Sequence, residues 1–80
     1  IVTSLRIDAV ISRITSLSRT MVISKIKNKE VYLNYEILTN NSYVLKENDV
    51  FSIRKYGKYK YNKVIKNTKK DNLIISYYKY

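Results

Sequence analysis

The 80-residue sequence contains no cysteine and no histidine. Their absence excludes thiolate and imidazole chemistry, disulfide bonds and the usual ligands of zinc. A chain without cysteine fits a reducing compartment. We therefore expect a cytoplasmic protein with no metal site and no cofactor.

Long apolar runs and catalytic motifs are also absent. No stretch approaches the roughly 18 residues of a membrane-spanning helix, and no signal-peptide pattern is visible. The sequence has no P-loop, no nucleophile elbow and no metal-ligand spacing, and its six acidic residues are scattered. We therefore predict that the chain is not an enzyme.

The length predicts a single small domain over residues 1–80, with a core at about residues 5–54 and a β extension over residues 55–80. At this size, roughly 60% of the surface of the unfolded chain can be buried, so the core is thin. The chain begins with Ile1 instead of Met, and we expect it to be excised from a longer protein.

Basic residues dominate the charged part of the composition, with sixteen Lys and Arg against six Asp and Glu, a net charge of +10. AT-rich coding explains the abundance of Lys over Arg and the nine tyrosines, but it does not explain the excess of basic over acidic residues. We interpret this excess as a signal for a polyanionic partner.

A first helix is predicted to begin after a cap at Thr3 or Ser4 and to end at about Thr15. Its first turn carries Arg6 and Asp8. Asp8 suits the positive end of the helix dipole, whereas Arg6 does not, so Arg6 is either a solvated or a functional residue. The apolar stripe recurs at helical spacing, at Ile7, Val10, Ile11 and Ile14.

A second helix is predicted to begin at Ser18, a good N-cap, and to end near Asn28, which we expect to adopt the left-handed exit conformation. Val22 and Ile26 form its buried line. Lysines in its last turns complement the helix dipole, so they have a structural explanation that requires no ligand.

Three strands should follow, at Val31–Asn34, Glu36–Thr39 and Val50–Ile53. A tight turn at Asn34-Tyr35 joins the first two, and a polar turn at Lys46–Asp49 precedes the third. Alternation along the first strand places its first and third residues inward.

The C-terminal part is strongly basic, because every charged residue from Arg54 to Lys70 is Lys or Arg. The alternating segment Lys58–Tyr61 predicts a strand with lysines on one face and tyrosines on the other. A polar turn over Asn67–Asn72 and a final strand over Leu73–Tyr80 complete a hairpin. The single glycine, Gly57, suggests a bulge or a close backbone approach.

An ordered set of positions between about Leu5 and Arg54 matches a known module. The positions are Arg6-Ile7-Asp8, Ser18-Arg19, Ile26-Lys27, Val31, Leu33-Asn34, Tyr43, Leu45-Lys46, Asp49-Val50 and Ile53. This set resembles the S4 domain, an RNA-binding module named after a small-subunit ribosomal protein. The extension with Tyr56-Gly57-Lys58-Tyr59 is similar to the C-terminal S4 module of the YlmH family of low-GC Gram-positive bacteria.

The resemblance implies an α+β fold in which two N-terminal helices pack on a small antiparallel sheet, with an extra C-terminal β-hairpin. It also implies a basic face built from the starts of both helices and the turn after the first strand. Asn34 could instead be only a turn former, and the strand lysines could instead only protect a sheet edge. The residues predicted to bind RNA are Arg6, Ser18, Arg19, Lys27, Lys29, Asn34, Lys46, Lys58 and Lys60.

The sequence departs from the family pattern at four positions. S4 domains usually have Leu where Lys25 stands and Gly where Lys29, Tyr35 and Asn48 stand. These departures bear on the packing near Lys25 and on the geometry of the turns, and they remove no basic side chain from the predicted face.

The predicted function is the binding of structured RNA, either rRNA or tRNA at the ribosome, by a monomeric domain of a longer protein. The tyrosines could stack on unpaired bases or could cover the core and sheet. The alternative is a basic adaptor that docks on an anionic membrane or on an acidic protein.

Overall fold

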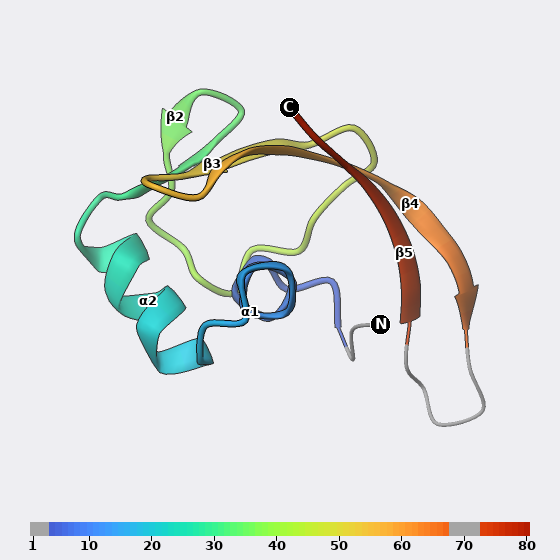
Figure 1. Cartoon of the computed structure of the whole chain (residues 1–80), viewed down its shortest axis with the longest axis horizontal. Helices are drawn as coiled ribbons and strands as arrows, with labels where there is room; N and C mark the ends of the chain where they lie inside the picture. Colours follow the sequence, from blue (N-terminus) through green and yellow to red (C-terminus); the bar gives the residue numbers. More distant parts are fainter. Residues whose placement is uncertain (1–3, 68–72) are drawn as a thin grey trace.

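The computed structural model describes residues 4–67 and 73–80. Two helices, α1 (Ile7–Thr15) and α2 (Arg19–Lys27), precede an antiparallel sheet of order β2-β1-β3-β4-β5. Both helices lie on one side of the sheet, which curves over them (Figure 1). The predicted α+β fold with two N-terminal helices and a C-terminal hairpin is confirmed. The strands are β1 (Val31–Leu33), β2 (Glu36–Ile37), β3 (Val50–Ile53), β4 (Gly57–Asn67) and β5 (Leu73–Lys79).

The core lies between the helices and the inward face of the sheet. The predicted stripe of α1 is buried at Ile7, Val10 and Ile11, and α2 contributes Val22 and Ile26. On the sheet, the Phe51 ring stacks on the Tyr59 ring with centroids 5.6 Å apart. The buried residues of the strands are Val31, Phe51, Ile53, Tyr59 and Tyr61.

Alternation along β4 divides its side chains between two faces, as predicted. Tyr59 and Tyr61 are buried in the core, while Lys58 and Lys60 are only partly buried and point away from it. We call the surface of the sheet that is turned away from the helices the outer face. It is formed by the residues that alternate with the core residues along β1, β3, β4 and the end of β5.

The start of α1 differs from the prediction, because no side chain caps it. The N-cap residue is Arg6, and the Ser4 hydroxyl accepts a hydrogen bond from the Arg6 N–H at 3.0 Å instead of capping the helix. The reason is a strand-like contact in which the Ile7 N–H donates to the Tyr43 carbonyl at 2.7 Å. Thr3 lies outside the described residues.

The end of α2 also differs from the prediction. Asn28 has φ −84°, and Lys29 instead takes the left-handed conformation with φ 61°. The Lys29 N–H donates to Ile26 and the Glu30 N–H donates to Lys25, which is the bonding pattern of a Schellman motif. Lys29 therefore occupies the position where S4 domains usually have glycine.

Two smaller predictions about the strands were wrong. The second strand ends at Ile37 instead of Thr39, and the residue that follows it, Leu38, is buried in the core. Gly57 marks no bulge, since the register shifts of β4 lie further along, and a Cβ there would meet only Lys79 Cε at 3.6 Å. Its φ of 114° is what favours glycine. The predicted turn at Asn67–Asn72 lies outside the described residues, apart from Asn67 at the end of β4.

Candidate nucleic-acid interface

Asp8, in the first turn of α1, is a buried carboxylate that gathers three side chains. Arg6 Nη2 donates to Oδ2 at 3.0 Å, Arg19 Nη2 donates to Oδ1 at 3.1 Å, and Asn41 Nδ2 donates to Oδ2 at 2.9 Å. Oδ1 also accepts the Ala9 N–H at 2.7 Å. One carboxylate thus joins the residue before α1, the first residue of α2 and a loop after β2.

The two guanidinium groups of this cluster remain accessible. The side chains of Arg6 and Arg19 are 41% and 47% exposed, whereas that of Asp8 is 0% exposed. One negative charge therefore orients two positive charges, and the cluster keeps a net positive charge at the surface. Because a guanidinium offers a planar fork of donors, this arrangement suits the oxygens of a phosphate group.

The ionisation of Asp8 follows from its partners. Burial by itself would raise the pKa of Asp8, but the hydrogen bonds from Asn41, Arg19 and Arg6 outweigh it, so the pKa lies below its ordinary value. Asp8 is therefore an anion at neutral pH and holds both arginines by charge as well as by hydrogen bonds.

Two further donors lie at the same end of the helices. Arg6 Nε is buried and has no hydrogen-bond partner among the described residues, and an unpaired buried donor costs about 1–3 kcal/mol. Ser18 caps α2, since its Oγ accepts the Met21 N–H at 3.1 Å, as predicted. Its hydroxyl hydrogen remains able to donate to a ligand.

A second buried carboxylate, that of Asp49, organises the turn that precedes β3. Asn34 Nδ2 donates to Oδ1 at 3.0 Å, and the Tyr43 hydroxyl donates to Oδ2 at 2.7 Å. The backbone N–H of Lys46 donates to Oδ2 at 2.8 Å. Asn34 Oδ1 also accepts the Val50 N–H at 2.9 Å, so this bonding favours the interpretation of Asn34 as a turn former.

The pKa values in this second cluster move in opposite directions. Burial would raise the pKa of Asp49, but the hydrogen bonds from Asn34, Lys46 and Tyr43 hold it below its ordinary value. The hydrogen bond to Asp49, together with burial, raises the pKa of Tyr43 to about 12. The hydrogen-bond donors here are neutral. The exposed side chain of Lys46 donates no hydrogen bond to Asp49, although its positive charge also helps to lower the pKa of Asp49.

The predicted residues at the far end of α2 do not join the arginine pair. Lys27 is eight residues beyond Arg19, which places it about 12 Å along the helix axis. Lys29 follows the helix, and its side chain lines a hollow beside the outer face together with Lys58. The structure therefore divides the predicted set between two ends of α2.

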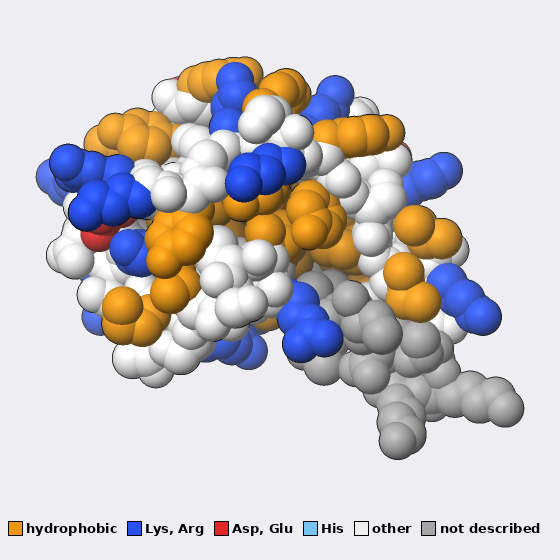
Figure 2. Space-filling model, in the orientation of Figure 1, with side chains coloured by type: hydrophobic (Ala, Val, Ile, Leu, Met, Phe, Trp, Pro, Cys, Tyr) orange, Lys and Arg blue, Asp and Glu red, His pale blue; other side chains and the backbone are white. Residues whose placement is uncertain are grey.

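The two predicted RNA-binding residues of the C-terminal hairpin lie apart from the starts of the helices. Lys58 and Lys60 lie on the outer face, because the core residues of β4 occupy the positions between them. Figure 2 shows Lys and Arg side chains spread around the visible face of the molecule, with hydrophobic groups between them, instead of one compact patch.

Sequence reasoning missed the roles of Asp8 and Asn41. The position of Asp8 in a first helical turn suggested only an interaction with the helix dipole, and Asn41 lay in a loop, 33 residues away along the chain. Arg6 and Arg19 were predicted individually, and the structure brings them onto a single carboxylate.

Two features of residues 4–67 and 73–80 bear on the other classes of function. In this part of the chain, neither helix is long and apolar enough to cross a membrane. The same residues contain no group of three or more Asp, Glu, His or Cys side chains that could hold a metal ion.

Comparisons with known proteins identify a curated relative. No protein-family model matches the chain. The chain is similar to ribosome-associated protein quality control protein P2 of Bacillus subtilis (strain 168), with 34% identity over 76 residues. The match covers 95% of this chain and 30% of the B. subtilis protein, so the chain spans about a third of the length of that relative.

Proposed function

We propose that this chain is an S4-like, non-catalytic RNA-binding domain of a longer protein that works on the ribosome in the cytoplasm. The order and packing of its elements agree with what the S4 resemblance implies, and the B. subtilis relative is named as ribosome-associated. The observation that carries the proposal is the pair of half-exposed arginines held by buried Asp8.

In the proposed mechanism, Arg6 and Arg19 bind phosphate oxygens of the RNA backbone. Asp8 fixes both guanidinium groups before the RNA arrives, so less side-chain entropy is lost on binding. Ser18 and the free N–H groups at the start of α2 lie beside Arg19 and add uncharged donors. Lys27 contributes charge further along α2.

The proposed partner is structured RNA, either rRNA or tRNA. The major groove of A-form RNA is too deep and narrow for side chains, so a surface of this kind contacts phosphates, 2′-hydroxyl groups and overall shape. We propose that the domain binds as a monomer and that affinity comes mainly from charge.

The alternative of a membrane adaptor has lost its main support. A membrane-surface helix needs an exposed apolar face beside its basic one. The apolar stripe of α1 is buried in the core at Ile7, Val10 and Ile11. Binding to anionic vesicles without binding to RNA would nevertheless reverse the ranking of the two functions.

The test is titration of a fluorescein-labelled RNA hairpin, followed by fluorescence anisotropy. We expect Arg19→Ala to weaken binding about tenfold, or about 1.4 kcal/mol, with little change in stability. Arg13→Ala is the matched control, because Arg13 is an exposed arginine in the last turn of α1 and its substitution removes the same charge as Arg19→Ala. It should weaken binding only about twofold through the loss of general attraction.

The salt dependence of the affinity in the same titration measures how many phosphates are neutralised on binding. If about five phosphates are neutralised, the plot of log affinity against log salt has a slope on the order of −4. A flat salt dependence, or equal effects of Arg19→Ala and Arg13→Ala, would refute the proposed site.

A further inference from the structure

The outer face of the sheet carries an ordered row of aromatic and basic side chains. Adjacent strands place Tyr32 of β1 beside Ser52 of β3, and Ser52 beside Lys58 of β4. A second row pairs Lys60 of β4 with Tyr78 of β5. Since the core residues occupy the alternate positions, these side chains all project away from the helices.

Tyr32 on this face is accessible, and so are Tyr35 and Tyr80 at its border, which lie on either side of a lysine. Tyr32 is 40% exposed, and Tyr35 and Tyr80 are 72% and 65% exposed. Lys58 Nζ lies 5.4 Å from the centroid of the Tyr35 ring and 4.5 Å from that of the Tyr80 ring. These cation–π contacts hold the lysine among rings that keep much of their surface free.

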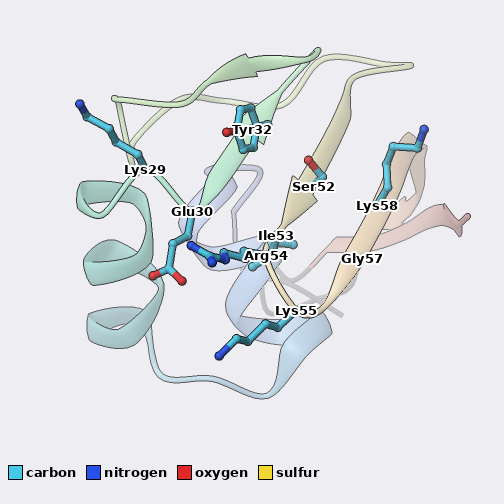
Figure 3. A pocket seen from close by; sticks show the side chains of 9 residues that line it. All are labelled: Lys29, Glu30, Tyr32, Ser52, Ile53, Arg54, Lys55, Gly57 and Lys58. Carbon is cyan, nitrogen blue, oxygen red and sulfur yellow. The ribbon is translucent and has the colours of Figure 1, made fainter.

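A hollow of about 700 Å³ opens at one end of this face (Figure 3). Its floor includes Tyr32 and Ser52, and its rims are the corner before β1 and the hairpin after β3. The Arg54 N–H donates to the Glu30 carbonyl at 2.9 Å, which fastens the two rims together. The basic side chains that line the hollow are Lys29, Arg54, Lys55 and Lys58.

Among residues 4–67 and 73–80, no ion pair neutralises the cations around the hollow. Glu30 is the one acidic residue that lines the hollow, against four basic ones. Every ion pair among residues 4–67 and 73–80 involves Asp8, which belongs to the helix side of the molecule. The hollow and the outer face therefore carry an excess of positive charge beside accessible aromatic rings.

We propose that the outer face binds an unpaired segment of RNA, separately from the arginine pair at the helix ends. Unpaired bases stack on the exposed rings of Tyr32 and Tyr35, and the lysines of the face contact the phosphates between them. Proteins that bind single strands combine aromatic platforms with basic grooves in this way, and the platform accepts any base because every base has a π-face.

The chemistry of the face favours this occupant over others. A second copy of the chain would bring two positively charged faces together, which is repulsive. A lipid surface is favoured by inserting side chains such as Trp, Phe and Leu, whereas the side chains that alternate with the core on this face are mostly tyrosine and lysine. An unpaired RNA strand offers phosphates to the lysines and bases to the tyrosine rings.

The test uses a labelled oligoadenylate of about 12 nucleotides, a length within the usual range of single-strand sites. We expect it to bind the wild-type chain, and we expect Tyr32→Leu to weaken binding about fivefold or more, because the ring is lost while apolar bulk remains. Tyr32→Phe should bind like the wild type. The matched control is Tyr77→Leu, since Tyr77 packs against the core residue Tyr59 on the opposite face.

The RNA hairpin is titrated in parallel, so that a failure of the arginine site and a failure of the outer face can be told apart. If Arg19→Ala loses hairpin binding while Tyr32→Leu binds oligoadenylate as the wild type does, the result supports the arginine site. The same result overturns the proposal that unpaired bases stack on the outer face. The proposal is also overturned if oligoadenylate fails to bind the wild type and Tyr32→Leu affects another partner. Weaker binding of Tyr32→Leu to anionic vesicles would assign the outer face to lipid, and dissociation of a dimer in sedimentation would assign it to a second copy of the chain.

Discussion

Asp8 and Asp49 are both buried aspartates that accept a hydrogen bond from an asparagine side chain, but their other partners differ in charge. Asp8 holds two arginines that remain half exposed. Asp49 holds a tyrosine hydroxyl and a backbone N–H. A buried anion with neutral donors fixes a turn, whereas a buried anion with exposed cations prepares a surface for a charged ligand.

This difference separates stability from binding. The hydrogen bonds of Asp49 come from neutral groups that hold the turn before β3, so we expect their loss to affect mainly folding. Those of Asp8 are made to Arg6 and Arg19, whose guanidinium groups are half exposed, so solvent screens these pairs and we expect them to contribute less to folding than the bonds of Asp49. We therefore expect substitutions at the two aspartates to have opposite profiles in unfolding and in RNA titration.

The largest expected effect is the loss of stability in Asp49→Ala. This substitution removes three hydrogen bonds to a buried charged group, and it should lower the free energy of unfolding by about 3 kcal/mol. Urea unfolding at neutral pH measures it. The fraction of Asp49→Ala that remains folded should bind the RNA hairpin with wild-type affinity, and weaker binding would break the distinction between the two sites.

Acid should expose a second difference between the two sites. Both carboxyl pKa values lie below their ordinary value, so the stability from each is present above about pH 4 and is lost as the pH falls through the folded-state pKa. Protonated Asp8 leaves two cations facing each other, whereas protonated Asp49 leaves neutral donors.

The acid loss that depends on Asp8 should therefore be reduced by salt, which screens the two arginines. Urea unfolding between pH 7 and pH 3 at low and high salt, with Asp8→Asn and Asp49→Asn, separates the two contributions. If salt changes the acid-induced loss of stability equally in Asp8→Asn and in Asp49→Asn, the arginines do not distinguish the two sites.

A smaller effect is expected from Tyr43→Phe, which removes one hydrogen bond to Asp49 and should cost about 1 kcal/mol at neutral pH. Because the pKa of Tyr43 is raised to about 12, its contribution is present below about pH 10 and is lost as the pH rises through the folded-state pKa. The difference in free energy of unfolding between the wild type and Tyr43→Phe should therefore become smaller as the pH rises over that range, as measured by urea unfolding in alkaline buffers. A constant gap would mean that the hydroxyl does not stabilise Asp49.

Local patterns predicted much of the fold. The 3.6-residue spacing placed Ile7, Val10 and Ile11 in the core, and alternation placed the lysines and tyrosines of β4 on opposite faces. The S4 comparison was also informative where the sequence departs from it. Positive φ values occur at the three non-glycine residues that stand where the family has glycine, Lys29, Tyr35 and Asn48.

Long-range contacts could not be predicted in this way. Asp8 meets Arg19 and Asn41 only after α1, α2 and the loop after β2 have packed together, and no local pattern encodes that meeting. Likewise, a basic segment in the sequence does not reveal which side of a sheet it will occupy. Lys58 and Lys60 were predicted only as members of the RNA-binding set, and the structure puts them on the outer face.

The central claim is that Asp8 holds the arginine pair for RNA, and Asp8→Asn tests it most directly. The substitution leaves the size of the side chain unchanged, removes one acceptor oxygen and raises the net charge by one. As a control, Glu36→Gln makes the same change of charge at an exposed residue of β2. We predict that Asp8→Asn weakens hairpin binding by about fivefold, or about 1 kcal/mol, while Glu36→Gln leaves it equal or slightly tighter. Equal or tighter binding by Asp8→Asn would contradict the account.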